Sequence, residues 1–243
     1  MGRSGVEWVD GREDLPAGVG TRRRATGLVC RLADVVSGVA VCVQLGASTV
    51  WAGMLEAYRS DGTVWAAFSY NDNYLTTPRA FALDPELQLA PGTARTRAGA
   101  PMFGAVTDSG PDRWGRFLVE RCEIGRAEAE GRSPHGLGEV DYLLAVRDEL
   151  RQGALRVRAD SPAGTEGTFL AADDADIATV ADLPDLLTLA DRAERGAADL
   201  QELQRLARAG CSVGGARPKV HVRDRDGRIV IAKFPAPSTT VGT

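Results

Sequence analysis

The sequence predicts an α+β fold, in which a strand-rich N-terminal subdomain is followed by helices and a C-terminal β-hairpin. Apolar side chains alternate with a period of two, which is typical of β-strands, in three segments of the N-terminal part: 39–45, 50–55 and 64–70. Helical spacing marks two later segments, 183–190 and 197–209. Two short strand patterns then flank a turn of charged residues and glycine at 223–227.

The composition is that of an ordinary globular protein. The chain has 243 residues, of which 44% are hydrophobic and 26% are charged, and its net charge is −4. It lacks the basic excess of a surface that coats nucleic acid, so no direct nucleic-acid partner is expected. Its four cysteines are isolated and it has only two histidines, so we expect neither a zinc site nor a disulfide framework. Free cysteines are typical of the reducing cytosol, and we expect a cytoplasmic protein.

The N-terminal region shows two features that bear on targeting. Residues 1–27 are rich in glycine and arginine without apolar periodicity, which predicts a disordered tail that is not a secretory signal. No charged residue occurs between Val35 and Leu55, a length that approaches a membrane span. Glycines and polar residues interrupt this segment, however, and its valines alternate with smaller neighbours. Two strands joined by a Gly-Ala-Ser turn at 46–48 are therefore favoured over a membrane helix.

Helices are expected in the middle of the chain. One should begin near Pro111, because proline suits the first helical position and Asp108 or Ser109 can cap it. Asp112 is interpreted as a charge of the first turn rather than as a catalytic acid. A second helix is expected over residues 140–150.

The last helices are expected to form a hairpin. A turn or linker rich in glycine, serine and proline is expected at 161–167. Arg195 and Gly196 then separate the helical segments 183–190 and 197–209. Such a short connection favours two antiparallel neighbours.

The chain's only two lysines, Lys219 and Lys233, lie 14 positions apart, although lysine and arginine together number 29. A glycine-rich stretch, SVGGARPK, ends at the first of them and lacks the spacing of a Walker A loop. Gly214 and Gly215 have no Cβ, so their amides can approach phosphate oxygens. Protein kinases place a glycine-rich loop and a strand lysine against ATP phosphates in this way.

Lys233 admits two interpretations. It shares a strand face with Ile229 and Ile231 because side chains alternate along a strand. An ammonium group on an otherwise apolar face should have a buried or ligand partner. The alternative is a plain loop that leads into an edge hairpin, with the Lys233 side chain extending to solvent.

Four blocks of sequence carry a family resemblance. They are FSYNDNYL with ALDPEL (68–87), DSGPDRWGRFLVER (108–121), DYLLAVRDELRQGALR (141–156), and SVGGARPKV with IVIAKFP (212–235). In this order they resemble the HipA family of bacterial serine/threonine kinase toxins. The resemblance implies a HipA-like N-terminal subdomain at 28–124. It also implies an incomplete region at 125–243, in which the β-hairpin is like that of a kinase N-lobe.

The resemblance also implies roles for individual residues. Ser212 matches the serine that the family autophosphorylates. Nucleotide binding is implied for the following residues: Val213, Gly214, Gly215, Ala216, Arg217, Pro218, Lys219 and Lys233. ATP and Mg²⁺ are the cofactors of the intact family. A HipB-like DNA-binding antitoxin is the implied partner, and an aminoacyl-tRNA synthetase is the implied substrate.

Catalytic and metal-holding residues of the family belong to a helical lobe that follows the strand lysine. None of the residues given is therefore expected to be catalytic or to hold metal. We expect a truncated toxin kinase that is inactive alone and does not bind Mg-ATP tightly. Loss of the lobe predicts an open apolar face on residues 203–235. One alternative is a non-catalytic binding module that pairs with a separate kinase chain or antitoxin. A membrane or scaffold protein built on residues 35–55 is the least favoured interpretation.

Overall fold

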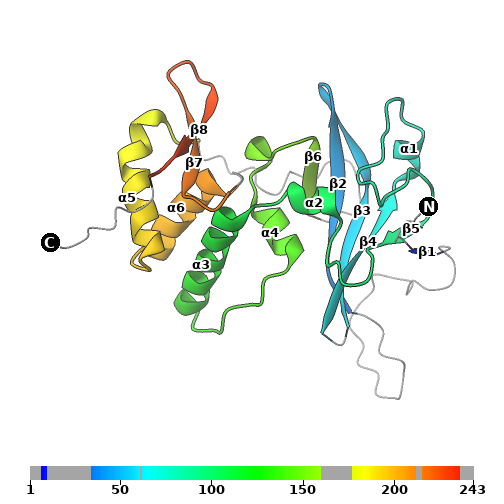
Figure 1. The fold of residues 1–243 in the computed structure, drawn as a ribbon, viewed down its shortest axis with the longest axis horizontal. Coiled ribbons are helices and arrows are strands. Elements are labelled where there is room, and N and C mark those ends of the chain that lie inside the picture. The colour runs from blue at the N-terminus through cyan, green and yellow to red at the C-terminus, as the bar shows by residue number, and fades with distance from the viewer. Residues whose placement is uncertain (1–6, 10–33, 61, 160–176, 212–214, 236–243) are drawn as a thin grey trace. The chain divides into compact units, whose positions relative to one another are not determined.

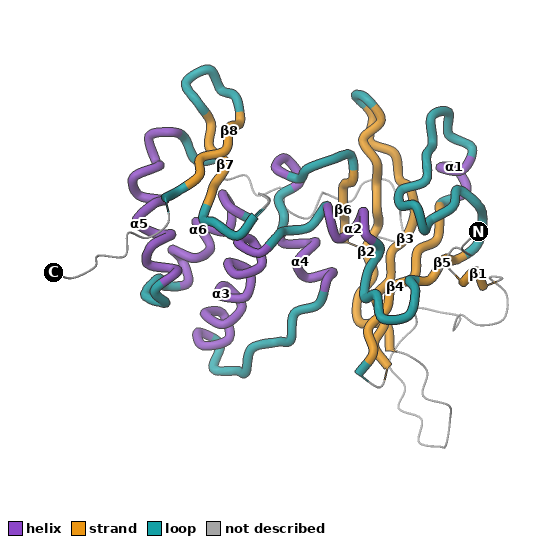
Figure 2. The backbone as a smooth tube through the Cα atoms, viewed as in Figure 1, coloured by secondary structure: helices purple, strands orange, loops and turns teal. Residues whose placement is uncertain are grey.

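A computed structural model describes residues 7–9, 34–60, 62–159, 177–211 and 215–235 (Figure 1). Helices and strands both contribute, which confirms the predicted α+β class (Figure 2). The chain forms two compact units. Unit 1 comprises Met1–Val106 and Ala154–Gly167, and unit 2 comprises Thr107–Gly153 and Thr168–Thr243.

Unit 1 is built on an antiparallel sheet of six strands in the order β1-β5-β4-β3-β2-β6. The strands are β1 (Glu7–Val9), β2 (Asp34–Leu45), β3 (Ser48–Ser60), β4 (Thr63–Tyr70), β5 (Thr93–Arg95) and β6 (Leu155–Ala159). Gly46, at φ +64°, lies in the turn between β2 and β3, and Gly62, at φ +79°, precedes β4. Positive φ favours glycine, so these two residues suit the tight connections.

One face of this sheet forms the core of unit 1. Val39, Val41, Leu55 and Phe68 are each no more than 1% exposed. They lie on one face because Leu55 is the cross-strand partner of both Val39 and Phe68. The short helix α1 (Asp72–Leu75) also belongs to unit 1, and α2 (Gly104–Asp108) contains the boundary with unit 2.

The three predicted strands are confirmed, since segments 39–45, 50–55 and 64–70 lie within β2, β3 and β4. The uncharged stretch from Val35 to Leu55 is the β2–β3 hairpin. Among the helices that the structure describes, none has both the length and the apolar character needed to cross a membrane.

Unit 2 packs helices against a two-stranded antiparallel hairpin, β7-β8. Its elements are α3 (Arg113–Ala129), α4 (Glu139–Ala145), η1 (Asp148–Leu150), η2 (Val180–Asp182), α5 (Leu183–Glu194), α6 (Leu200–Gly210), β7 (Lys219–Arg223) and β8 (Ile229–Lys233). Helices α3 and α6 lie side by side, and β7 follows against α6 (Figure 1). Their shared core includes Trp114, Leu118, Leu206, Val220 and Val222.

The helical hairpin predicted around Arg195 and Gly196 is confirmed as α5 and α6. Gly196 adopts φ +72°, a conformation that suits glycine at the end of a helix. A capping box then starts α6, because the amide of Glu202 donates to Asp199 and the amide of Asp199 donates to Glu202, each at 2.9 Å.

The helix predicted to begin near Pro111 is α3, but the predicted caps are wrong. The helix begins at Arg113, and its N-cap position is Asp112 rather than Asp108 or Ser109. Asp108 instead ends α2, and the Gly110 amide donates to the Thr107 carbonyl oxygen in the turn that follows. The residue expected to cap α3, Asp108, thus belongs to the end of the preceding helix.

The predicted helix over 140–150 is shorter than expected. It ends at Ala145, because Val146 is extended, and η1 follows separately. The buried guanidinium of Arg151 donates to the carbonyl oxygens of Leu143 at 2.9 Å and Val146 at 3.0 Å. These contacts give the last carbonyls of α4 a partner without a further helical turn.

The observed division of the chain is discontinuous. The expected boundary between residues 124 and 125 falls inside α3, which is continuous from Arg113 to Ala129. The two units part at Val106, and the chain returns to unit 1 at Ala154. There β6 pairs antiparallel with β2. The expected tail at 1–27 and linker at 161–167 lie largely or wholly outside the described residues.

Candidate functional site

The predicted phosphate loop lies between α6 and β7 in unit 2. Helix α6 ends at Gly210, and Cys211 closes it with an amide donated to Ala207. Ser212, Val213 and Gly214 lie outside the described residues, which resume at Gly215. The proposed autophosphorylation serine and two of the nucleotide-contacting residues therefore have no described position.

Both the backbone conformation at position 215 and the adjacent Lys219 side chain require a glycine there. Its φ is +107°, and a Cβ placed there would meet the Nζ atom of Lys219. Its carbonyl oxygen accepts a hydrogen bond of 3.3 Å from the backbone amide of Trp114, in the first turn of α3. The loop is thus attached to the N-terminus of α3, with the Lys219 ammonium beside Gly215.

Lys219 is held in place by close packing on α3. It is only 4% exposed, and its carbonyl oxygen accepts a 3.1 Å hydrogen bond from the indole Nε1 of Trp114. Gly210 allows this approach, because a Cβ there would lie 3.0 Å from the Lys219 carbonyl oxygen and 3.1 Å from the indole nitrogen. Gly115 does the same on α3, since its Cβ would collide with the carbonyl oxygen of Cys211.

Asp112 supplies a counter-charge to Lys219. Burial raises the pKa of Asp112 above its usual value, while the Lys219 charge and the amides of Trp114 and Gly115 act in the opposite direction. The side chain makes no capping hydrogen bond, although those amides are near enough to stabilise its charge. Within the described residues, its Oδ1 atom is buried without a hydrogen-bond partner. Asp112 is therefore an acidic neighbour of Lys219 that has one oxygen atom without a hydrogen bond in the described part of the chain.

The chain's only two lysines are direct cross-strand partners, because Lys219 pairs with Lys233 in the β7–β8 hairpin. Directly opposed residues place their Cβ atoms about 4.5–5.5 Å apart on one face of the sheet. Like charges in this relationship repel each other. An anion bound between the two ammonium groups would remove that repulsion.

Lys219 is the buried lysine of the pair, and the Lys233 side chain is open to solvent. Lys233 is exposed, and its neighbours Ile229 and Ile231 on the same face are 40% and 47% exposed. His221, the partner of Ile231, is buried, and burial lowers the pKa of its imidazole. The hairpin face therefore changes from buried on β7 to open on β8.

The remaining loop residues divide by exposure. Ala216 and Arg217 are exposed, whereas Pro218 is buried and its carbonyl oxygen accepts a 2.9 Å hydrogen bond from the Phe234 amide. This bond closes the base of the hairpin next to the lysine pair. The described structure thus brings Gly215, Lys219 and Lys233 into one region of unit 2.

Two residues of this region, Asp112 and Trp114, were not predicted as parts of the site. Both belong to α3, and the Trp114–Lys219 contact joins positions 105 residues apart in the chain. No local motif marks such a contact. The only available signal was the presence of Asp112 and Trp114 in a block that resembles the same family as the loop.

Comparison with known proteins does not assign the chain to a family. No protein-family model matches the chain, and no curated protein matches it. In the part of the chain that the structure describes, no group of three or more histidine, cysteine, aspartate or glutamate side chains is arranged to hold a metal ion.

Proposed function

We propose that unit 2 carries the phosphate-contacting loop and lysine pair of a HipA-like serine/threonine kinase. The observation that carries the proposal is the pairing of Lys219 with Lys233 at the base of the hairpin. Two opposed ammonium groups beside a glycine loop provide positive charge and backbone access for a polyphosphate. Phosphate contact, rather than phosphoryl transfer, is the role proposed for these residues.

The two lysines would contribute differently to such a contact. Lys219 is buried and already balanced in part by Asp112, so it sets the local charge and holds the loop. Lys233 is exposed and can move to meet a phosphate oxygen. Because one loop and one hairpin offer few contacts, Mg-ATP should bind weakly to the chain, and an equilibrium titration is a poor test.

A covalent probe detects a weak contact of this kind. In an acyl phosphate of ATP, the lysine amine attacks the acyl carbonyl carbon, an amide forms, and ATP leaves. With only two lysines in the chain, peptide mass spectrometry assigns the modified position without ambiguity. We expect Lys233 to be modified and excess Mg-ATP to suppress the modification by at least about fivefold, as for a site that the competitor occupies most of the time.

A lysine introduced elsewhere on the hairpin gives the matched control. Arg228→Lys places an ammonium in the exposed turn before β8. Acetyl phosphate, which lacks the nucleotide, should modify positions 228 and 233 alike, whereas Mg-ATP should protect only Lys233 from the nucleotide probe. Equal protection of both positions, or protection of neither, would refute nucleotide contact at the lysine pair.

A non-catalytic binding role is the second candidate, and the exposure of β8 favours it. Ile229, Val230 and Ile231 are 40%, 36% and 47% exposed, within the segment 203–235 for which an open apolar face was expected. One edge of β8 has no strand partner among the described residues. Exposed apolar edges of this kind accept a strand from a partner.

The proposed partners for this edge are a separate kinase chain of the same family or a HipB-like antitoxin. Ile231→Lys should abolish co-elution with such a partner, because it places a charge in the centre of β8. Ile124→Lys, on α3, changes a side chain that is also exposed, at 37%, and should leave co-elution intact. Co-elution that survives Ile231→Lys would exclude β8 as the contact. The proposed aminoacyl-tRNA synthetase substrate rests on the family resemblance alone.

A further inference from the structure

The Lys219 ammonium group lies where the loop meets the N-terminus of α3. A Cβ at Gly215 would touch the Nζ atom of Lys219, and the same Cβ position is 3.9 Å from the Oδ2 atom of Asp112. Asp112 is the N-cap residue of α3, and the Trp114 amide in the first turn donates to the Gly215 carbonyl oxygen. The Asp112 carboxylate, the Lys219 ammonium and the backbone of Gly215 are therefore close neighbours.

Asp112 does not serve its helix in the usual way. Aspartate is favoured at an N-cap because its side chain accepts hydrogen bonds from amides of the first turn. Among the described residues, however, the Asp112 side chain forms no capping hydrogen bond, and its buried Oδ1 atom has no partner. Burying a carboxylate oxygen in this way costs free energy. The negative charge should therefore have another role, and the ammonium group that acts on it is that of Lys219.

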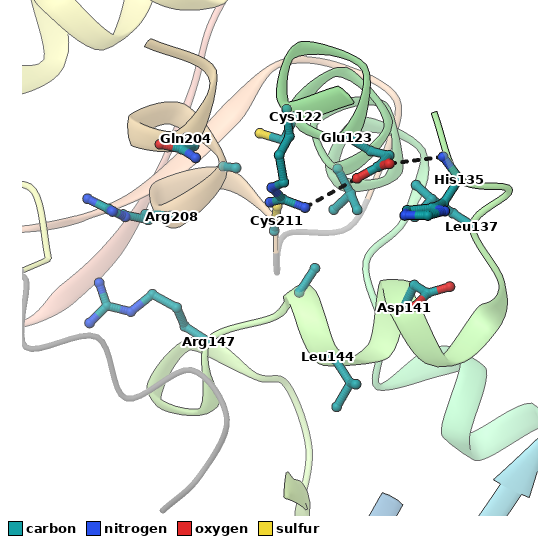
Figure 3. Close-up of a pocket in the computed structure, with 14 residues that line it drawn as sticks. Cys122, Glu123, His135, Leu137, Asp141, Leu144, Arg147, Gln204, Arg208 and Cys211 are labelled. Carbon is teal, nitrogen blue, oxygen red and sulfur yellow. Dashed lines mark hydrogen bonds and ion pairs between the residues drawn. The ribbon is translucent and has the colours of Figure 1, made fainter. Parts of the chain in front are cut away.

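Another buried carboxylate of unit 2 shows the difference. Glu123 is 5% exposed and lines a cavity of about 770 Å³ between α3, α4 and α6. Its Oε1 atom accepts a 2.6 Å hydrogen bond from Arg132 and a 2.9 Å bond from the His135 amide (Figure 3). Its Oε2 atom accepts a 3.2 Å bond from Arg126. Direct donors thus engage both oxygen atoms of Glu123, in contrast to Asp112.

The Lys219 ammonium group also lacks a direct partner in the part of the chain that the structure describes. The residue is 4% exposed, and its Nζ atom forms no hydrogen bond or ion pair with a described residue. Asp112 acts on it through the attraction of opposite charges. Lys233, its cross-strand partner, is exposed on the same face of the hairpin. An anion that approaches from Lys233 would therefore meet an ammonium group that still has hydrogen bonds to donate.

We propose that Asp112 is a built-in competitor for anions at the lysine pair. Its carboxylate balances the Lys219 charge while no anion is bound, and it repels a phosphate oxygen that approaches the same ammonium group. Protonation of Asp112 removes this repulsion, so the affinity for an anion rises as the pH falls. The inference rests on the proposed phosphate contact at the lysine pair and adds the residue that regulates it.

The pH dependence must be separated from that of neighbouring groups. Burial raises the pKa of Asp112 above its usual value of 3.8, although the Lys219 charge opposes this shift. Further charged or titratable side chains on the surrounding elements are Arg113 and Arg116 of α3, Arg208 of α6, Arg217 of the loop, His221 of β7 and Lys233 of β8. Of these, only the histidine is of a type that changes charge between about pH 5 and pH 8. Burial lowers the pKa of its imidazole.

Sulfate is a suitable probe, because it carries no nucleotide and stays a dianion over this pH range. Acetylation by N-acetoxysuccinimide, a neutral reagent, reports its binding: the lysine amine attacks the acetyl carbonyl carbon, an amide forms, and N-hydroxysuccinimide leaves. Peptide mass spectrometry of the full chain assigns the product to Lys219 or Lys233, the only two lysines. Acetylation with and without sulfate is compared at each pH and at constant ionic strength, so the pH dependence of amine reactivity cancels.

Asp112→Asn removes the charge and keeps the size of the side chain. We expect the sulfate concentration that halves acetylation of Lys233 to fall about tenfold at neutral pH, as for removal of one like charge beside an anion. In the wild type this concentration should decrease as the pH is lowered. In Asp112→Asn it should change less, and the remaining change comes from His221. Asp112→Glu keeps the charge and should resemble the wild type.

A control variant tests for a general effect of charge. Asp226→Asn makes the same charge change in the exposed turn of the hairpin and should leave protection by sulfate unchanged. If a thermal melt shows that Asp112→Asn does not fold, Asp112→Ser takes its place, because serine can cap α3.

Three results would overturn the inference. One is equal protection by sulfate in the wild type and in Asp112→Asn. Another is an equal gain in Asp226→Asn, which would indicate attraction to net charge. The third is the absence of protection at both lysines in every variant. Protection of Lys233 from the nucleotide probe by Mg-ATP is a separate measurement, so failure of the nucleotide contact is distinguished from failure of the role of Asp112.

Discussion

The indole Nε1 of Trp114 donates a 3.1 Å hydrogen bond to the backbone carbonyl oxygen of Lys219. This bond joins the first turn of α3 to the first residue of β7, and both residues are buried, at 3% and 4% exposure. It fixes the position of the lysine backbone while the Lys219 ammonium lies beside Gly215.

Trp114→Phe should lower the free energy of unfolding by about 1–3 kcal/mol, because it leaves the Lys219 carbonyl oxygen buried without its donor. Urea denaturation measures the change. Trp51→Phe is the control, since Trp51 donates a 3.0 Å bond to the Gly53 carbonyl oxygen in unit 1 but is only partly buried. Water can replace that donor, so a loss as large as that of Trp114→Phe would contradict the prediction.

Gly215→Ala should expose Lys219 to solvent. An alanine at φ +107° is strained, and its Cβ would displace the Lys219 ammonium. Modification by acetyl phosphate, followed by mass spectrometry, should rise at Lys219 and stay constant at Lys233. In Gly153→Ala the φ is also positive, at +77°, but the Cβ meets nothing within 4 Å. That variant should lose about 1 kcal/mol of stability and keep Lys219 protected.

Arg151→Lys should lower the free energy of unfolding by about 2–3 kcal/mol, although the charge is retained. The guanidinium donates to the carbonyl oxygens of Ser109 at 2.9 Å, Leu143 at 2.9 Å and Val146 at 3.0 Å, and the side chain is 2% exposed. One ammonium group cannot span all three acceptors. Thermal and urea unfolding would measure the loss.

An exposed arginine gives the comparison for Arg151. Arg195 forms a 2.8 Å ion pair with Asp191, and its side chain is 71% exposed. Arg195→Lys should change stability by less than about 0.5 kcal/mol. If both variants lost a similar free energy of unfolding, the three carbonyl contacts of Arg151 would not be the source of its contribution to stability.

Glu123 should make stability depend on acid pH. Hydrogen bonds from Arg132 and from the His135 amide lower the pKa of its carboxyl from 4.5 to about 2. The folded state therefore favours the ionised form, so its stabilising contribution is complete above pH 4.5 and is lost as the pH falls toward 2. Glu123→Gln should be less stable than wild type at pH 7, with a difference that narrows below pH 4.5.

Melting temperatures measured between pH 7 and pH 3 would test this dependence. Glu130→Gln is the matched control, because Glu130 also contacts Arg132 but its side chain is 52% exposed. Glu130→Gln should change the melting temperature little at any pH in this range. A difference between wild type and Glu123→Gln that is constant with pH would contradict the assigned titration.

Much of unit 1 could be predicted from the sequence. The period-two pattern located β2, β3 and β4, because large apolar residues alternate with smaller or polar ones along each strand. The short strand β5 was not predicted from the sequence. Its three residues are too few to show a period, and pairing with β4 determines its conformation.

In unit 2, the local sequence patterns predicted which helices form more accurately than they predicted where those helices end. Gly196 follows the C-cap of α5, and Asp199 and Glu202 form the capping box of α6, so the helical hairpin could be predicted. The end of α4 could not, because it depends on Arg151, which binds the helix carbonyls from outside the helix. A contact from a residue outside the helix does not change the apolar periodicity of the helix sequence, so that periodicity cannot show where the helix ends.

For the candidate site, the sequence by itself determined that the only two lysines lie in one segment with a glycine-rich stretch, and that each begins or ends a strand pattern. The tertiary structure alone decided which lysine is buried. Lys219 is enclosed because Trp114 and Gly115 of α3 pack against the loop, and Lys233 is open because no described strand covers β8. Burial depends on contacts between segments about a hundred residues apart, whereas alternation along a strand records only which residues share a face.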